Sequence, residues 1–260
     1  MKNLSGPVWG VLARYYLLVS ALVAVCTFVA DVNPSSAQRA STRSRSREHL
    51  SAAQLIEQGK VQFERGRYAF AIRSLSAALR KDGKAADAFM LRGRAYDQMG
   101  LVKQAETDFT TYVSLRPSNP EGYIHRGDAR NFNHDHLAAL EDYNTAVKLA
   151  PSSTAAHLGR GLAYAGLERY DHAIKDYQWV LKSEPANHEA LANMGIACML
   201  AGRRLEAVTY FERALKVEKD PQWRSRIEKW MAKLVHEAGT TSAKSRGPTR
   251  TPDEPTKPLW

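Results

Sequence analysis

The residues of this chain that could do chemistry are few, and most of them are histidines. The 260 residues include eight histidines and two cysteines. The densest group is His134-Asp135-His136, and side chains at alternate positions of a turn can both reach a metal ion. No third ligand follows at a spacing typical of a metal motif, so a polar turn between two helices is the favoured interpretation. We predict no metal and no cofactor.

Other catalytic arrangements are also missing from the sequence. No glycine-rich phosphate loop follows a predicted strand, and no serine or cysteine stands in a nucleophile elbow. Two cysteines, Cys26 and Cys198, are too few for a disulfide framework or a cysteine metal cluster. Cys198 takes a position that other parts of the chain fill with aromatic residues, which predicts a buried, inert thiol. The sequence therefore predicts a protein that is not an enzyme.

A period of 34 residues organises the middle of the chain. Glycine recurs five times at this interval, and alanine and a large apolar residue follow each glycine after twelve and sixteen residues. The three series are Gly59, Gly93, Gly127, Gly161, Gly195; Ala71, Ala105, Ala139, Ala173, Ala207; and Leu75, Phe109, Tyr143, Tyr177, Phe211. Prolines at 117, 151 and 185 close three units, because proline ends helices. Each unit predicts two short helices that cross at the glycine and the alanine.

Residues 52–219 resemble five tandem tetratricopeptide repeats. The resemblance implies an all-α fold, a right-handed α-solenoid of five helix pairs over residues 51–219. Because a stack of helix pairs leaves its last apolar face open, the amphipathic segment 220–238 is predicted to be a capping helix. A docking helix for a partner is the alternative for this segment.

Oppositely charged residues also recur with the repeat. Arginine precedes the glycine in three repeats, and aspartate precedes the aromatic residue of the second helix: Arg92, Arg126, Arg160 and Asp108, Asp142, Asp176. The shared register predicts ion pairs between packed helices, within a repeat or to its neighbour. We interpret these six residues as structural and not as ligand contacts. The pattern is similar to one found in many bacterial tetratricopeptide repeat proteins.

The resemblance further implies that the first helices line a concave groove, which in this family usually holds a partner peptide or helix. Spacing from the glycines predicts a groove that is mixed in charge toward its N-terminal end and apolar toward its C-terminal end. The predicted groove residues are Lys60, Met90, Arg94, Asp97, Asp128, Asn131, Leu158, Leu162, Ile196 and Met199. His125 and His157 fall on first helices and are predicted to be exposed. The alternative for the apolar strip is that the cap or the tail of this chain folds back over it.

The N-terminal segment reads as a targeting signal. A basic start is followed by an uncharged apolar run over residues 15–30 and by small residues at Ser35 and Ala37, which predicts a signal peptide over residues 1–37 and export to the periplasm. The alternative is an uncleaved inner-membrane anchor over residues 8–30, because four arginines follow the apolar run and positive charge prefers the cytoplasmic side. A Ser/Arg-rich spacer (38–50) and a polar, proline-rich tail (239–260) are predicted to be disordered.

The net charge of +10 does not by itself indicate nucleic acid. The predicted repeats and cap, residues 51–238, carry 27 basic and 23 acidic residues, and much of the excess lies in the flanking segments. The arginine spacer lacks the interleaved aromatic residues that stack on bases. We therefore predict a protein or peptide partner and no nucleic acid, with membrane contact through the N-terminal segment.

Overall fold

The computed structural model describes residues 50–245, with the side chains of residues 50–234. The predicted signal peptide, nearly all of the predicted spacer and the end of the predicted tail lie outside the described residues. Within residues 50–245 the chain forms eleven α-helices and no strand. None of the described helices combines the length and the apolar character that a membrane crossing needs.

Ten of these helices form five antiparallel pairs. We name the first helix of each pair the A helix and the second the B helix. The pairs are α3 (Ala52–Glu64) with α4 (Tyr68–Lys81), α5 (Ala86–Gln98) with α6 (Val102–Leu115), α7 (Pro120–Phe132) with α8 (His136–Leu149), α9 (Thr154–Gly166) with α10 (Tyr170–Ser183), and α11 (His188–Leu200) with α12 (Arg204–Val217). Every pair coincides with one 34-residue unit, which confirms the prediction of five repeats in an all-α solenoid fold.

Polar N-cap residues mark the starts of most A helices. Ser51 caps α3 in a reciprocal arrangement with Gln54, in which each side chain accepts a hydrogen bond from the backbone N–H of the other residue. Asn119, Ser153 and Asn187 cap α7, α9 and α11 in the simpler way, by accepting one backbone N–H. Four of the five A helices therefore begin at a polar cap.

The turns between A and B helices share one backbone conformation. Seven residues after the repeat glycine, each turn has a residue with positive φ: Gly66, Gly100, His134, Glu168 and Gly202. Glycine adopts this left-handed conformation freely, whereas His134 and Glu168 adopt it at a cost. The polar group at residues 134–136 is thus an ordinary repeat turn in which histidine replaces the usual glycine.

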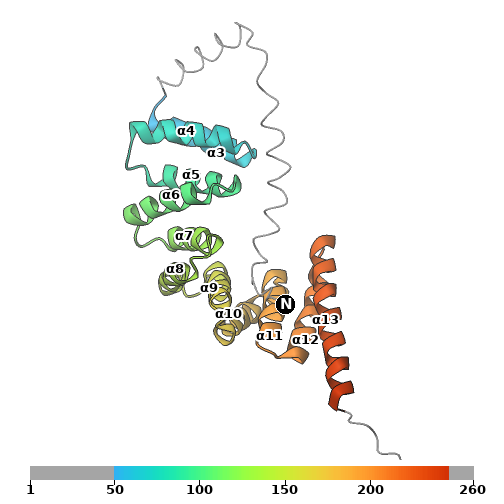
Figure 1. Ribbon diagram of the computed structural model, residues 1–260. Coiled ribbons are helices and arrows are strands. Elements are labelled where there is room, and N and C mark those ends of the chain that lie inside the picture. Colours follow the sequence, from blue (N-terminus) through green and yellow to red (C-terminus); the bar gives the residue numbers. More distant parts are fainter. Residues whose placement is uncertain (1–49, 246–260) are drawn as a thin grey trace, which may run out of the picture. The chain divides into compact units, whose positions relative to one another are not determined.

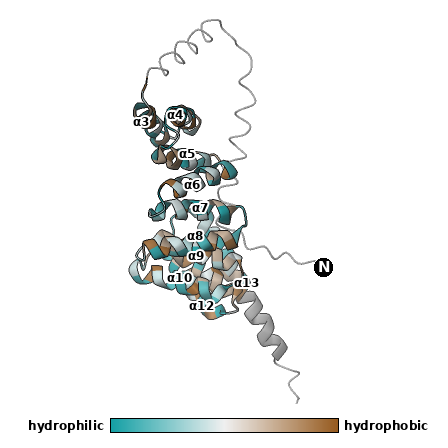
Figure 2. Ribbon diagram, turned by 90° about the vertical axis from the view of Figure 1, so that its left-hand side faces the viewer, coloured by the Kyte–Doolittle hydropathy of each residue, from teal (hydrophilic) through white to brown (hydrophobic). Residues whose placement is uncertain are grey.

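The glycines that recur every 34 residues leave room for the large side chain sixteen positions later, which is Leu75 in the first repeat and an aromatic residue in the other four. A Cβ atom placed on Gly93 would lie 2.6 Å from the ring of Phe109, and one on Gly161 would lie 2.5 Å from the ring of Tyr177. Both rings are buried. Because a real Cβ never approaches that closely, glycine sets the distance between the two helices of each repeat. Figure 2 shows that hydrophilic and hydrophobic residues share the same helices.

The chain divides into two compact units, residues 1–180 and 181–260. In the described part of the first unit, helices α3 to α9 follow one another as stacked pairs (Figure 1), and each B helix also contacts the next A helix. The second unit contains the fifth pair and the last helix, α13 (Pro221–Ser245).

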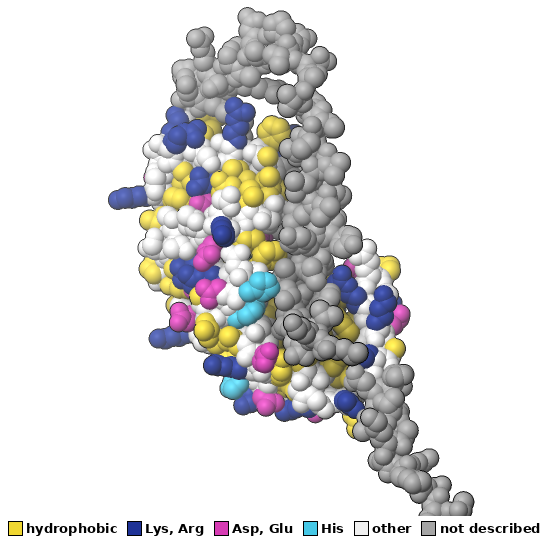
Figure 3. Space-filling model, viewed as in Figure 1, with side chains coloured by type: hydrophobic (Ala, Val, Ile, Leu, Met, Phe, Trp, Pro, Cys, Tyr) yellow, Lys and Arg dark blue, Asp and Glu magenta, His cyan; other side chains and the backbone are white. Residues whose placement is uncertain are grey.

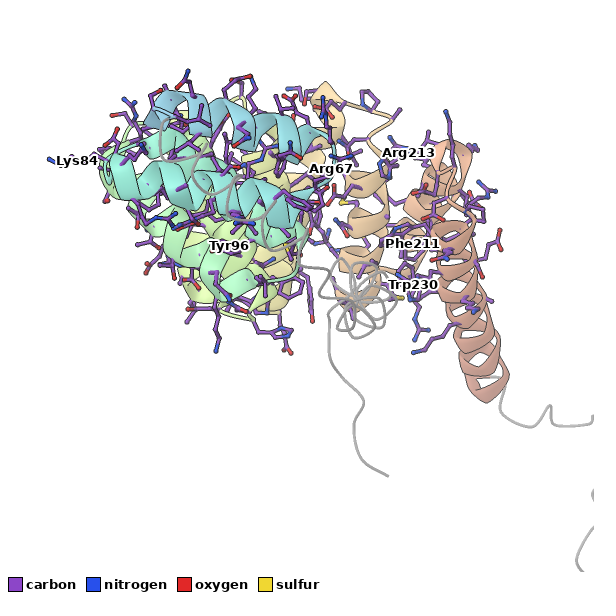
Figure 4. All side chains as sticks on the ribbon, turned by 90° about the horizontal axis from the view of Figure 1, so that it is seen from above. Arg67, Lys84, Tyr96, Phe211, Arg213 and Trp230 are labelled. Carbon is purple, nitrogen blue, oxygen red and sulfur yellow. The ribbon has the colours of Figure 1, made fainter. Side chains whose placement is uncertain are left out.

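Helix α13 packs on α12, as the predicted cap should. Ile227 and Leu234 are buried, and Trp230 stacks on Phe211 of α12 with ring centroids 5.7 Å apart; Figure 4 labels these two rings where the helices meet. Arg224 donates hydrogen bonds to the carbonyl oxygens of Leu215 and Glu218 at the end of α12. These contacts fix α13 to the last repeat.

The predicted end of this helix was wrong. The sequence indicated a cap over residues 220–238 and a disordered tail from Gly239, but α13 continues to Ser245. A glycine inside a helix costs only about 1 kcal/mol relative to alanine, and residues 240–245 contain no proline. The first proline of the tail, Pro248, lies beyond the helix end.

Candidate protein-interaction surface

The three arginines that precede the repeat glycines point into the protein. Arg92 donates from Nε and Nη2 to the two carboxylate oxygens of Asp108, both at 2.7 Å. Arg160 binds Asp176 in the same two-pronged way at 2.9 and 2.7 Å, and Arg126 Nη2 lies 2.6 Å from Asp142 Oδ1. Each pair joins the A and B helices of one repeat, which confirms the predicted ion pairs and their structural role.

Two of these arginines also reach the preceding repeat. Arg92 Nη1 donates to Ser76 Oγ at 3.0 Å, and Arg160 Nη1 donates to Asn144 Oδ1 at 3.3 Å. The hydrogen bonds to the aspartates raise the pKa of all three guanidinium groups, against the opposing effect of burial. Because each guanidinium is committed to a buried carboxylate, none of the three is available to a partner.

The first repeat uses neutral groups at the same two positions. Gln58 stands where the arginine stands in later repeats, and Ser74 stands where the aspartate stands. Ser74 Oγ donates to Gln58 Oε1 at 3.1 Å. The last repeat has Met194 and Tyr210 at these positions. The charged pairs are therefore confined to the three central repeats.

The A helices also contact one another in the first unit: α3 contacts α5, α5 contacts α7, and α7 contacts α9. We call the side chains that these four helices expose the A-helix face. Lys60, Arg94 and Asp128, which each follow their repeat glycine directly, are exposed on it, and Asp97 and Asn131 are half-buried. These five predicted groove residues therefore lie on neighbouring helices of one face.

Two predicted groove residues are instead part of the core. Met90 is 7% exposed and belongs to a buried cluster with Phe109 and Tyr112 of α6. Leu158 is 9% exposed. The 34-residue period predicted correctly which helix carries each residue, but it did not show how far neighbouring side chains cover it. Met90 and Leu158 are therefore not candidates for partner contact.

Several polar residues of the A-helix face already hold partners within the fold. The guanidinium of Arg94 lies 5.0 Å from the ring centre of Phe63, a cation–π contact between α5 and α3. Asp128 Oδ1 accepts a hydrogen bond from the hydroxyl of Tyr143 at 2.7 Å. These contacts orient the charged groups while leaving both residues exposed.

His125 lies among these groups. Its ring stacks on Phe109 with centroids 5.3 Å apart, and its Nδ1 lies 3.9 Å from Asp128 Oδ2. Burial lowers the pKa of His125, and the nearby Arg94 guanidinium lowers it further, although Asp97 and Glu121 act in the opposite direction. His125 is therefore a partly exposed imidazole that favours its neutral form.

In the second unit, α11 carries the remaining candidates on an unusually apolar helix. Ile196 and Met199 are half-buried, and Leu200 is 41% exposed. Leu162, the equivalent of Ile196 on α9 of the first unit, is also half-buried. These side chains offer partial apolar surface rather than the fully open strip that the sequence predicted.

Cys198 has the buried position that the sequence predicted. The side chain is fully buried, and this burial raises the pKa of its thiol to about 11. Because only the thiolate is a good nucleophile, the structure agrees with an unreactive thiol.

The histidine group at residues 134–136 does not assemble a metal site. No cluster of three or more potential ligand residues occurs among the described side chains. His136 Nδ1 lies 2.6 Å from Asn131 Oδ1, so this ring is held by an amide of the preceding helix. Burial and the neighbouring His134 lower the pKa of His136.

Sequence reasoning missed two residues. Arg130 binds both Asp142 at 2.9 Å and Glu106 of the previous repeat at 3.0 Å, and thus joins two repeats. His157, predicted to be exposed, is buried. The only sequence signal for Arg130 was an arginine where the second and fourth repeats place Tyr96 and Tyr164. No sequence signal marked His157.

The repeat pattern and the paired helices both recur in known proteins. A family model described as tetratricopeptide repeat matches residues 56–120, 126–178 and 158–222, which is more than half of the chain. This chain belongs to the tetratricopeptide repeat family. A comparison with curated protein sequences finds no match.

Solved structures of tetratricopeptide repeat proteins have the same fold. A MamA protein is 26% identical with a TM-score of 0.59, and the match covers 64% of this chain and 91% of that one. YrrB, described as a TPR protein with an unusual peptide-binding site, is 20% identical with a TM-score of 0.59 over 72% of this chain and 97% of its own. TTC0263, a protein of Thermus thermophilus, is 24% identical with a TM-score of 0.56, over 69% and 98%. The last two likenesses concern the fold alone.

Proposed function

We propose that this tetratricopeptide repeat protein is a non-enzymatic scaffold that binds a segment of a partner protein on its A-helix face. The observation that carries the proposal is the contrast between two adjacent register positions. The residue before the repeat glycine is a structural arginine in three successive repeats. On the four A helices of this face, the residue after it varies in chemistry and stays at least partly accessible: Lys60, Arg94, Asp128 and Leu162.

This variation suits recognition of an irregular polypeptide. A purely structural position repeats its chemistry, as the arginines do, whereas a surface that reads a partner offers different side chains along its length. Three charged side chains followed by the apolar Leu162 favour a partner segment with a charged part and an apolar part. Peptide binding by YrrB, a protein of the same fold, supports a peptide as the ligand class.

We further propose that the protein is exported and works in the periplasm as part of an envelope-associated assembly. The support is the predicted signal peptide over residues 1–37; the inner-membrane anchor over residues 8–30 remains the second candidate. Mass spectrometry of the N-terminus of the protein isolated from its own cells decides between them. A chain that begins at Gln38 agrees with export, and an intact N-terminal segment contradicts it.

Nucleic acid is not part of the proposed function. In the view of Figure 3, acidic and basic side chains of the described surface alternate over the first unit without forming a continuous basic stripe. Binding to nucleic acid depends on such concentrated positive charge. This distribution supports a protein partner instead.

The proposal is tested by charge reversal on the A-helix face. A tagged full-length chain is used to recover bound proteins from its own cell envelope, in parallel with the variants Arg94→Glu and Arg73→Glu. Arg73 is the matched control, since it is an exposed arginine on B helix α4. We expect Arg94→Glu to lose a protein that the wild type and Arg73→Glu both recover. Equal recovery by all three chains would contradict the proposed surface.

A further inference from the structure

Basic residues are concentrated in the first helix pair. Residues 50–84, which contain α3 and α4, carry seven basic and three acidic residues, whereas residues 85–180 carry ten basic and twelve acidic residues. Figure 3 shows basic side chains over this first pair. The described part of the first unit is therefore positively charged where the stack of repeats begins and slightly negative along the rest of its length.

Helix α4 presents part of this charge beside an exposed aromatic ring. Four of its residues follow one another at intervals of three or four and therefore lie on one side of the helix: Phe70, Arg73, Ala77 and Arg80. Phe70 is 56% exposed, and both arginines are exposed. Lys81 is exposed next to Arg80. We call these five residues the α4 basic face.

The two arginines of this face have no polar partner among the described residues. Neither Arg73 nor Arg80 forms a side-chain hydrogen bond, an ion pair or a ring contact within residues 50–234. Arg92, in contrast, is bound to a buried carboxylate. Asp82, the acidic residue nearest to Arg80 in the sequence, accepts a hydrogen bond from the backbone N–H of Lys84 at 2.9 Å. Both guanidinium groups are therefore accessible to an anion outside the fold.

The other B helices do not offer the same surface. Helices α6, α8, α10 and α12 each contain two acidic residues, whereas α4 contains none. At the position of Arg73, α6 and α8 have Thr107 and Glu141. Helix α10 has Lys175 at this position, but the exposed Asp171 precedes it by one turn. A purely basic side is therefore particular to the first repeat and is not a consequence of the 34-residue period.

The segment before α3 indicates which anion this face meets. Residues 38–49 contain four arginines and one acidic residue, so the positive charge of the first pair continues into this segment. The apolar run over residues 15–30 precedes it, and both predictions for this run, a signal peptide and an anchor, bring the chain to a membrane. In the anchored form, residues 31–49 reach at most about 65 Å from the bilayer. A membrane is therefore the anionic surface to which the sequence directs the first pair.

We propose that the α4 basic face lies against a membrane that contains anionic phospholipid. Arg73 and Arg80 bind the lipid phosphate groups, as basic residues next to a membrane do, and the ring of Phe70 enters the headgroup region. The helix does not insert further, because its apolar side is packed in the repeat, where Leu75 and Ala78 are fully buried. The contact is thus peripheral and depends on lipid charge.

This membrane contact is separate from the proposed partner binding. It uses a B helix, whereas the partner is proposed to bind the A-helix face. Arg73→Glu is therefore still expected to retain the partner protein, and position 73 contacts lipid rather than a second protein. Failure of the membrane proposal leaves the partner proposal intact, and the reverse also holds.

Lipid photo-cross-linking is the direct test, because its result does not depend on how residues 1–37 attach the chain. A photoreactive amino acid replaces Phe70 on α4 or, as the matched control, Gln104, which is exposed at the same register position of α6. The full-length chain is mixed with phosphatidylcholine vesicles that contain labelled phosphatidylglycerol, an anionic lipid. We expect lipid-labelled protein from position 70 and none from position 104. Equal labelling at the two positions, or none at position 70, would overturn the proposal.

Neutralisation of the arginines gives the second readout. Labelling from position 70 is measured in a chain that also carries Arg73→Gln and Arg80→Gln, and in a control that carries Lys148→Gln and Lys175→Gln, two exposed lysines at the same register positions of α8 and α10. A basic residue close to an anionic membrane strengthens binding roughly fivefold, so the arginine variant should label about 25-fold less at low lipid concentration. The lysine control should label like the wild type. Unchanged labelling of the arginine variant would refute the proposal.

A DNA duplex tests the other source of phosphate groups. It is added as an unlabelled competitor at the same phosphate concentration as the anionic lipid. We expect the lipid labelling from position 70 to persist, because Phe70 makes an apolar contact that lipid offers and the DNA backbone does not. Complete loss of labelling would show that the α4 basic face binds nucleic acid instead of a membrane.

Discussion

Asp142 is the most heavily used carboxylate among the described residues of the three central repeats. It is 3% exposed and accepts hydrogen bonds from Arg126 of its own repeat and from Arg130, which also reaches Glu106. Asp108 by contrast binds the single arginine Arg92. Removal of a buried carboxylate leaves its cationic partners uncompensated.

We therefore expect Asp142→Asn to destabilise the protein by about 3 kcal/mol and Asp108→Asn to destabilise it by less. The free energy of unfolding is measured by urea denaturation, with Glu141→Gln as the control, because Glu141 is exposed beside Asp142. A larger loss for Asp108→Asn than for Asp142→Asn would show that the second arginine contributes nothing.

Cys198 gives a prediction about reactivity. Burial raises the pKa of its thiol to about 11, so the thiol is protonated at neutral pH and becomes reactive only as the pH approaches that value. We expect slow alkylation of Cys198 in the folded chain near pH 8 and fast alkylation in denaturant, measured on its tryptic peptide by mass spectrometry. Equal rates in both conditions would contradict the burial.

At the residue scale, the sequence predicted the contacts that recur with its period of 34 residues. The spacing of sixteen between Arg92 and Asp108 is a repeat property, so the ion pairs could be predicted without coordinates. The burial of His157 could not be, because its partners come from a turn six residues earlier and a helix nineteen residues later. No repeated residue type marks those contacts.

At the scale of elements, glycine sets the distance between paired helices because it has no Cβ atom. A Cβ atom on Gly93 would lie 2.6 Å from Phe109, whereas one on Gly83, in the turn after α4, would have its nearest neighbour at 3.9 Å. Neither glycine has a positive φ. The two positions thus differ in the space around them and not in backbone strain.

We expect Gly93→Ala to lower the free energy of unfolding by about 1–3 kcal/mol, because the ring of Phe109 must move in a packed core. Gly83→Ala is the control and should change stability by less than about 0.5 kcal/mol. Thermal unfolding of both variants measures the difference. Similar melting temperatures would mean that the helices of the second repeat can separate without cost.

Element boundaries were predictable where a cap or a proline marks them and not elsewhere. The prolines at 117, 151 and 185 predicted where three units end, and Ser51 and Pro120 stand at the starts of α3 and α7. The end of α13 was misjudged because Gly239 resembled a stop signal, although glycine is only a weak helix breaker. The exposure of Met90 was misjudged for a related reason, since the period assigns a residue to a helix but does not show what covers it.

At the scale of the whole molecule, two adjacent positions of the repeat have different roles. In the central repeats, the residue before the repeat glycine forms an internal ion pair. The residue after the glycine is exposed to solvent in the first three repeats, as Lys60, Arg94 and Asp128. A basic chain of net charge +10 therefore offers a mixed-charge face on its A helices. This division between structural and accessible positions is the central claim about function.

Site-specific photo-cross-linking tests that claim most directly. A photoreactive amino acid is placed at position 94 on A helix α5 or at position 73 on B helix α4 of the full-length chain, which is irradiated in its own cells. We predict a discrete cross-linked species with a second protein from position 94 and none from position 73. The same species from position 73, or no species from position 94, would contradict binding on the A-helix face.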